Sequence, residues 1–433
     1  PPSGGGGGGG TPGGGSTIDG TNVDDSTTTG PDGGGQRTTE IDPVPENRTD
    51  DPSTPNADLA DVEVGNEDGG ENDLSLGLPT GVGATVEGKT TRLSGQAAAD
   101  DLIARIQDKA GEDDDGPLSD DGQGFLDRLP DDGPVTVRTV TPSFTGDGVP
   151  GTIQLTGSDS ADSFEAVVLD VSNLPSGTVI DLSNVDFVSI VGGQTITGGP
   201  GNNDAAGDSS AQIIVLGPGD DTISGGGGAD SVGSEGGNDI VYGNADTDTV
   251  FGGEGTDQVY GNQGVDEVYG NQGDDLVFGG QDADLVFGGQ DSDQVYGNKA
   301  DDQVYGNKGD DQLFGGQDAD DLFGGQGDDL IYGNLGDDRI YGNKGDDTLY
   351  GGEGADSFAF LSGDGQDTVA DFGDGDTISL AAGINGSGIE SFADLTITET
   401  AAGDTRIDLG DGNSLTLQGV AADTLSEADF SFF

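Results

Sequence analysis

The chain contains no cysteine, histidine, methionine or tryptophan. Without cysteine, no disulfide, thiolate metal site or cysteine nucleophile can form, and without histidine the commonest general base and zinc ligand are missing. Zinc-dependent proteolysis through histidine ligands is therefore excluded within this chain. Catalysis by a pair of carboxylates would need a distinctive acidic pair, and none stands out. We expect this chain not to be an enzyme.

Basic residues are scarce, at 13 against 84 acidic ones, which gives a net charge of −71. A compact chain with this charge repels itself unless cations are bound. Nucleic acid and anionic membrane surfaces are therefore poor partners, and multivalent cations are good ones. No run of 18 apolar residues occurs, so we expect no membrane span. Hydrophobic residues make up only 30% of the chain, which argues against a large three-dimensional core.

The first half of the chain falls into three stretches of different composition. Residues 1–82 are rich in Gly, Thr, Asp and Pro, and we expect a disordered arm or linker there. Residues 83–133 hold one amphipathic helix, predicted from Gln96 to Ala110, followed by an acidic loop. Residues 134–215 alternate short apolar runs with Gly, Pro, Asn and Asp turns. This pattern predicts a β-rich N-terminal cap that covers the open end of the segment after it.

A nine-residue repeat occupies residues 216–359 without a break. The unit is Gly-Gly-x-Gly-x-Asp-x-U-x, in which U is large and apolar, and its residues are called positions one to nine below. Position eight is apolar in all sixteen copies, which a merely solvated acidic linker would not require. Position six is Asp in all sixteen copies: Asp221, Asp230, Asp239, Asp248, Asp257, Asp266, Asp275, Asp284, Asp293, Asp302, Asp311, Asp320, Asp329, Asp338, Asp347 and Asp356.

These repeats resemble the repeats-in-toxin (RTX) nonapeptides of haemolysin-type calcium-binding proteins. The resemblance implies an all-β fold, a right-handed parallel β-roll in which the Gly-rich half of each unit is a turn and position eight points inward. It also implies that the sixteen Asp residues bind Ca²⁺ together with turn carbonyls, an all-oxygen shell that this ion prefers. Each ion is expected between turns of successive coils, bridged by Asp residues two repeats apart such as Asp275 and Asp293.

Charge counting agrees with calcium binding. Residues 216–359 contain 32 acidic and four basic side chains. Sixteen repeats form about eight coils and would hold about 14 Ca²⁺ ions, which nearly cancels the charge of the block. We therefore expect the block to unfold on chelation. Position four is Ala300 in one repeat, and Ser234-Glu235 replaces Gly-Gly in another, so we expect the weakest sites beside Ala300 and Glu235.

Position nine points outward in this geometry, yet it is Tyr or Phe in thirteen consecutive repeats and holds all eight tyrosines. Two repeats per coil place these rings in two columns about 4.8 Å apart per rung, close enough to stack. The columns are Tyr260, Phe278, Tyr296, Phe314 and Tyr332 on one side, and Tyr269, Phe287, Tyr305, Phe323 and Tyr341 on the other. They either stiffen the roll after duplication of a 36-residue unit, or dock a second copy or a cell-surface glycan.

Residues 360–433 keep elements of the repeat in a looser spacing and resemble the C-terminal segment of the same family. The resemblance implies a capping β-structure and an uncleaved type I secretion signal, with export at low cytosolic calcium and folding outside the cell. We therefore expect a secreted calcium-binding structural or adhesive protein, such as a surface-layer, filament or matrix component. The alternative is a calcium-dependent export and folding module of a larger secreted toxin or hydrolase.

Overall fold

The computed structural model describes residues 16–18, 21–29, 35–46, 59–64, 74–110, 115–130, 133–158 and 164–433. The chain divides into two compact units, with the boundary between Val232 and Gly233. No helix in the described ranges is long and apolar enough to cross a membrane. The expected fold class, all-β with a parallel β-roll, is confirmed.

The first unit begins with antiparallel strands. In the stretch 1–82, expected as an arm, the described residues form strands, while residues 1–15 and several later gaps lie outside the described ranges. Val62 and Val64 alternate with polar residues and are at most 1% exposed, which explains why this Gly- and Asp-rich stretch can form sheet. The strands are β1 (Ser16–Ile18), β2 (Thr21–Thr29), β3 (Gly35–Ile41), β4 (Ala60–Val64), β5 (Leu74–Leu78) and β6 (Val82–Lys89).

The stretch 134–215, expected as a β-rich cap, consists of rungs of the parallel roll itself. One parallel sheet contains β7 (Val135–Phe144), β9 (Phe164–Asp170), β11 (Phe187–Val191), β13 (Asp204–Ala206) and β15 (Thr222–Gly226). The other contains β8 (Ile153–Gly157), β10 (Val179–Ser183), β12 (Thr195–Gly198) and β14 (Ile213–Pro218). Antiparallel pairing joins β6 to β7 and β5 to β8.

Two helices cover the outer face of the first of these sheets. Helix α1 (Gln96–Ala110) has the expected bounds, whereas α2 (Asp115–Arg128), which begins where the expected acidic loop Glu112–Asp115 ends, was not expected. Leu102 and Ile106 of α1 are fully buried, and Phe125 of α2 stacks on Phe187 with ring centroids 5.2 Å apart. A Cβ on Gly122 would lie 3.2 Å from side-chain carbons of α1, so glycine permits the close approach of the two helices.

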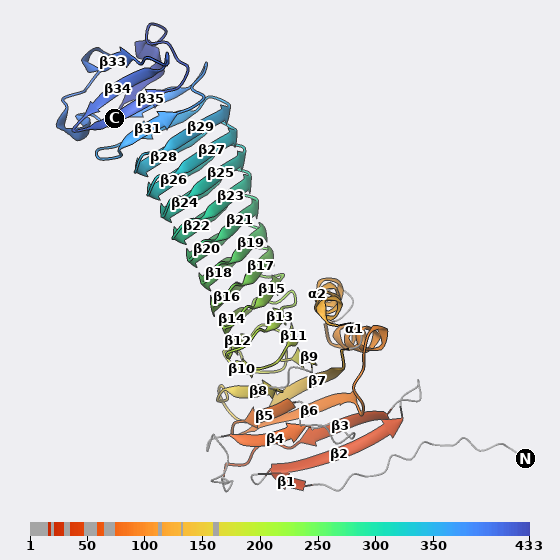
Figure 1. Cartoon of the computed structure of the whole chain (residues 1–433). Coiled ribbons are helices and arrows are strands. Elements are labelled where there is room, and N and C mark those ends of the chain that lie inside the picture. Colours follow the sequence, from red (N-terminus) through yellow and green to blue (C-terminus); the bar gives the residue numbers. More distant parts are fainter. Residues whose placement is uncertain are drawn as a thin grey trace, which may run out of the picture. The chain divides into compact units, whose positions relative to one another are not determined.

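The second unit contains the regular roll, in which strands of six residues alternate between two parallel sheets (Figure 1). Partners lie 18 residues apart, so that Tyr242, Tyr260 and Phe278 follow each other in register. Position-eight side chains from Val241 to Phe358 are 0% exposed and form the core. Strand β16 (Ser231–Gly236) contains the unit boundary. The odd-numbered strands are β17 (Ile240–Ala245), β19 (Gln258–Gln263), β21 (Leu276–Gln281), β23 (Gln294–Lys299), β25 (Gln312–Gln317), β27 (Leu330–Leu335) and β29 (Thr348–Glu353). The even-numbered strands are β18 (Thr249–Glu254), β20 (Glu267–Gln272), β22 (Leu285–Gln290), β24 (Gln303–Lys308), β26 (Asp321–Gln326) and β28 (Arg339–Lys344).

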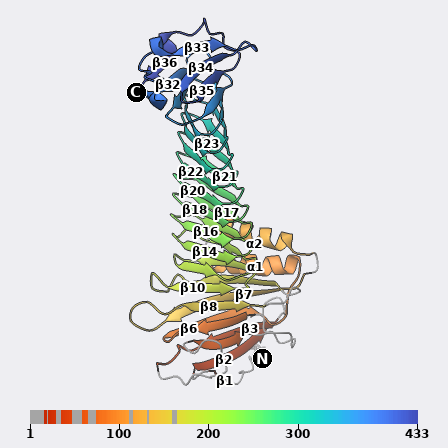
Figure 2. The ribbon, with the colours of Figure 1, turned by 60° about the vertical axis from the view of Figure 1, so that its left-hand side comes forward.

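The C-terminal strands continue both sheets and then close the end of the second unit (Figure 2). β31 and β35 extend the odd-numbered sheet in parallel, and β34 and β33 follow antiparallel to them. β30, β32 and β36 extend the even-numbered sheet. The elements are β30 (Ser357–Phe360), β31 (Gln366–Val369), β32 (Thr377–Leu380), η1 (Ile384–Gly386), η2 (Phe392–Asp394), β33 (Thr396–Glu399), β34 (Thr405–Gly410), β35 (Asn413–Leu417), η3 (Glu427–Asp429) and β36 (Phe430–Phe432).

Candidate calcium-binding turns

The position-six Asp residues line the buried side of the turns, immediately before each strand. All sixteen are at most 4% exposed. Their Oδ1 atoms accept backbone amides from the equivalent residue two repeats earlier; Asp275 Oδ1, for example, accepts the Asp257 N–H at 2.9 Å. Asp293 Oδ1 accepts the Asp275 N–H at the same distance. Asp275 and Asp293, expected to bridge one ion through their side chains, are thus joined by a hydrogen bond from a backbone amide to a carboxylate.

The second carboxylate oxygen of these residues has no hydrogen-bond partner and is buried. A buried carboxylate oxygen without a partner is costly, and a bound cation removes that cost. These Oδ2 atoms belong to Asp257, Asp266, Asp275, Asp284, Asp293, Asp302, Asp311, Asp320, Asp329, Asp338, Asp347 and Asp356.

The Oδ2 atoms pack closely against the position-one glycines. A Cβ on Gly270 would lie 2.6 Å from Asp275 Oδ2 and 2.5 Å from the carbonyl oxygen of Gly288, two repeats later. A Cβ on Gly297 would lie 2.5 Å from Asp302 Oδ2 and 2.7 Å from the carbonyl oxygen of Gly315. At both glycines a carboxylate oxygen and a backbone carbonyl oxygen, which are ligands that Ca²⁺ prefers, thus lie close together. Glycine at position one permits this close approach.

Burial raises the pKa of these carboxyl groups well above 3.8. Loss of hydration is the largest cause, and neighbouring carboxylates on the same turn edge add to it. The pKa rises to about 8 at Asp284, Asp293, Asp320 and Asp329. It rises to about 7 at Asp275 and Asp302, and to about 6 at Asp257, Asp266, Asp311, Asp338, Asp347 and Asp356. A cation beside these carboxyl groups would favour their ionised form.

Among the described residues, no three acidic side chains converge on one point. A cation in a turn would therefore take most of its oxygen ligands from backbone carbonyls, and only a minority from side chains. This arrangement depends on the left-handed turn conformation. Position four adopts a φ of 72–74° at Asp282, Asp291, Asp318 and Ala300 alike, so the Ala300 turn resembles the turns with Asp at position four, whereas Gly273 at position four has a φ of 121°.

The same hydrogen-bond register extends beyond the sixteen repeats. At the N-terminal side, Asn203 and Gln212 occupy the position of the repeat Asp, and their N–H groups are accepted by Asp221 and Asp230 at 2.7 Å. At the C-terminal side, Asp367 Oδ1 accepts the Asp347 N–H at 3.1 Å, across a spacing of 20 residues. Asp367 is 1% exposed, its Oδ2 has no partner, and burial raises its pKa to about 8.

Asp376 accepts the Asp356 N–H at 3.0 Å in the same way. Both Asp367 and Asp376 escaped the sequence prediction because a two-residue insertion shifts them out of the nine-residue phase. The segment Gly365-Gln366-Asp367-Thr368-Val369, which retains the order of the repeat, was the signal that could have found the first of them.

The family model for the RTX calcium-binding nonapeptide repeat (4 copies) matches the chain in overlapping windows that together cover residues 197–369. Residues 197–369 belong to the RTX calcium-binding nonapeptide repeats. The matched span is about two fifths of the chain and includes the N-terminal turns at Asn203 and Gln212. RTX repeats bind calcium, in agreement with the buried Oδ2 row. No curated protein matches the chain.

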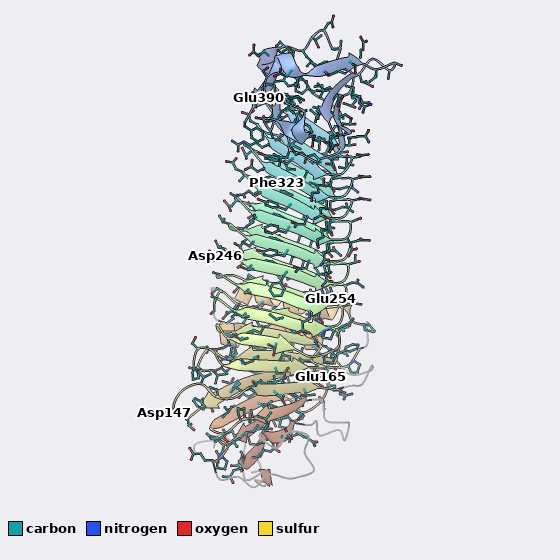
Figure 3. The ribbon with its side chains drawn as sticks, turned by 90° about the vertical axis from the view of Figure 1, so that its left-hand side faces the viewer. Asp147, Glu165, Asp246, Glu254, Phe323 and Glu390 are labelled. Atoms are coloured by element: carbon teal, nitrogen blue, oxygen red, sulfur yellow. The ribbon has the colours of Figure 1, made fainter. Side chains whose placement is uncertain are left out.

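The predicted stacking of the position-nine rings on the outside of the RTX roll is confirmed. Ring centroids along both columns are 4.5–5.1 Å apart, with interplanar angles of 3–21°. Tyr242 and Tyr350 extend the first column at its two ends. The rings are half-buried because each lies against its neighbours along the column. Figure 3 shows Phe323 on the outside of the strands, between the two turn edges.

Proposed function

We propose that this chain is a secreted calcium-binding structural or adhesive protein, a component of a surface layer, filament or matrix, that folds when Ca²⁺ binds outside the cell. The buried Oδ2 row carries the proposal. Twelve consecutive position-six carboxylates, from Asp257 to Asp356, have an oxygen without a hydrogen-bond partner in the folded roll. Such a row opposes folding unless cations neutralise it.

Under this proposal the position-six Asp residues from Asp221 to Asp356 are the calcium ligands. The first four of them, Asp221, Asp230, Asp239 and Asp248, are included because they take part in the same hydrogen-bond register. Asp367 continues the series by the criteria of burial and hydrogen bonding. About 14 ions would bind in the turns of the sixteen repeats. Each ion would lie between two neighbouring turns of one edge, so each edge holds one ion fewer than it has turns.

Circular dichroism of the purified chain tests the calcium-dependent folding. In excess chelator we expect loss of the β signal, and its return when Ca²⁺ is added. Mg²⁺ at the same concentration is the matched control, since it requires a smaller octahedral shell than these carbonyl-rich turns offer. An unchanged spectrum in excess chelator would contradict the proposal.

Export can be tested separately from folding. Deletion of about the last 60 residues removes β32–β36, and we expect the truncated chain to stay inside the cell because this segment resembles the family's secretion signal. The control is the full chain with Asp275, Asp311 and Asp329 changed to Asn, which should be exported normally because export precedes calcium binding. Normal export of the truncated chain would refute the assignment of this segment.

The alternative, an export and folding module of a larger secreted toxin or hydrolase, makes a different prediction for the purified chain. A module should remain monodisperse in Ca²⁺, whereas a structural protein should form ordered filaments or sheets. Electron microscopy with and without Ca²⁺ separates these outcomes. The regular outer faces of the RTX roll support the structural role, because a folding module has no need of them.

A further inference from the structure

The two outer faces of the RTX roll differ in the number of charged side chains that they carry. The odd-strand face consists of the outward side chains of β17, β19, β21, β23, β25, β27 and β29, at positions seven, nine, two and three. Its charged side chains are Lys299 and Glu353. The even-strand face is the equivalent surface of β18–β28, and it carries Glu254, Glu267, Lys308, Asp321, Arg339 and Lys344.

The excess acidic charge of the roll lies on the turn edges. Position-four and position-five Asp residues occupy these edges, and Figure 3 shows Asp246 at one of them. On a chain with a net charge of −71, the odd-strand face is thus a broad and nearly uncharged surface. Two copies can approach each other there with little like-charge repulsion.

The ring stacking decides between the two kinds of partner that an aromatic column could have. Within the column, both flat faces of each ring lie against neighbouring rings, for example at 4.9 Å between Tyr260 and Phe278 and 4.8 Å between Phe278 and Tyr296. Sugar rings bind aromatic side chains by stacking on a flat face, and inside the column these faces are covered. The exposed ring edges favour contact with protein side chains, including rings in edge-to-face geometry.

The polar groups on the odd-strand face suit a second copy. Six glutamines lie on it, and an amide both donates and accepts hydrogen bonds, so a glutamine-rich surface is complementary to itself. Leu335 on the same face is 46% exposed. The glutamines are Gln258, Gln263, Gln281, Gln294, Gln312 and Gln317.

The area of the odd-strand face also fits a dimer. Seven strands spaced about 4.8 Å apart, each of six residues with a rise of about 3.3 Å, span roughly 600 Å². Two such faces would bury about 1,200 Å² together, which is the lower limit for a stable interface between two proteins.

We propose that two calcium-loaded copies of this chain pack with their odd-strand faces against each other in an isologous pair. The proposal rests on the calcium-dependent folding proposed above. The occupant of the face is a second copy of the chain, held by ring edges, glutamine amides and leucine side chains.

Identical strands on opposite faces provide a matched test. β21 and β22 have the same sequence, Leu-Val-Phe-Gly-Gly-Gln, and each ends in an exposed glutamine. The test variant carries Gln281→Glu and Gln317→Glu on the odd-strand face. The control variant carries Gln290→Glu and Gln326→Glu on the even-strand face, at the same repeat position and exposure. The change in net charge is equal in both.

Sedimentation velocity in saturating Ca²⁺ measures the association. We expect the wild-type chain and the control variant to dimerise, and the test variant to associate at least about tenfold more weakly. Added NaCl should strengthen the wild-type dimer, because salt screens repulsion between the acidic edges and no ion pair holds the interface. A monomeric wild-type chain at all concentrations, or equal weakening in both variants, would overturn the proposal.

Binding to an insoluble polysaccharide, cellulose or chitin, is the remaining outcome. If the wild-type chain and the control variant bind the polysaccharide and the test variant does not, the odd-strand face binds a glycan and the self-association is overturned. A calcium titration followed by circular dichroism accompanies every measurement. A chain that folds with Ca²⁺ but stays monomeric refutes the dimer and leaves the calcium-dependent folding intact, whereas a chain that does not respond to Ca²⁺ refutes the calcium-dependent folding itself.

Discussion

Adjacent Asp residues in three repeats allow the buried carboxylates to be tested against exposed ones. The buried triple is Asp275→Asn, Asp311→Asn and Asp329→Asn at position six. The exposed triple is Asp274→Asn, Asp310→Asn and Asp328→Asn at position five, one residue earlier in the same repeats. Both triples remove three negative charges. Each of the six carboxylates accepts one backbone N–H at 2.8–3.0 Å, which an Asn Oδ1 can also accept.

The two triples differ in the second oxygen. At position six it is buried against a position-one glycine, whereas the position-five side chains are exposed. Removing one partner of a buried charge pair costs about 3 kcal/mol per site, or about 9 kcal/mol for three sites. If about 14 ions bind in one cooperative folding step, this free energy is shared among them, and the free Ca²⁺ concentration at the folding midpoint should rise about threefold.

The assay is a titration with buffered free Ca²⁺, followed by circular dichroism, with ion stoichiometry from calorimetry. We expect the midpoint to rise for the buried triple, with fewer ions bound, and to remain near the wild-type value for the exposed triple. Equal shifts in both triples would mean that calcium acts only by screening the net charge. An unshifted buried triple would exclude its Oδ2 atoms as ligands.

Three further predictions concern the same turns. Because burial raises the pKa of carboxyl groups such as Asp293 from 3.8 to about 8, the calcium-free roll should be most stable below about pH 4 and should lose stability as the pH rises towards 8. With Ca²⁺ present, protons compete with the ion for these carboxylates. The Ca²⁺ concentration at the folding midpoint, measured by Ca²⁺ titration, should therefore fall from pH 6 to pH 8. Gly270→Ala should weaken calcium-dependent folding, whereas Gly124→Ala, with no atom within 4 Å of the new Cβ, should be neutral or stabilising by about 0.5–1 kcal/mol in thermal unfolding. Ala300→Gly should stabilise the calcium-loaded roll by up to about 1 kcal/mol, measured by its melting temperature, because Ala300 holds a φ of 74°; no change would show that this turn is unstrained.

The sequence predicted the roll where its period is strict and failed where the period changes. Position eight is apolar in every repeat, and every such side chain from Val241 to Phe358 is fully buried. The parallel rungs β7–β13 carry no such period, because turns of different lengths separate strands that still pair in register. Burial of a polar group is also invisible to a pattern search. Asp367 resembles any other loop carboxylate until the structure places it one rung beyond Asp347.

Helix α2 was missed for a different reason. Gly116, Pro117, Gly122 and Gly124 are poor helix formers, so local propensity argues against a helix in this segment. Tertiary packing overrides that propensity, because Leu118 and Phe125 are buried against α1 and the sheet, and Gly122 lies where a larger residue would touch α1. Local preferences cannot reveal a contact that exists only after the sheet has formed.

Position five and position six form two ladders that run in opposite directions along each turn edge. A position-six carboxylate accepts the amide of the repeat before it on that edge, as Asp329 accepts from Asp311. A position-five side chain accepts the amide of the repeat after it, as Asp328 accepts from Asp346. Asn238 does the same for Thr256 without any charge, so the position-five ladder requires an oxygen acceptor and no cation. Acidic residues in one turn thus have two separable roles. Position five joins the coils through hydrogen bonds alone, and position six, under our proposal, makes the joined coils depend on calcium.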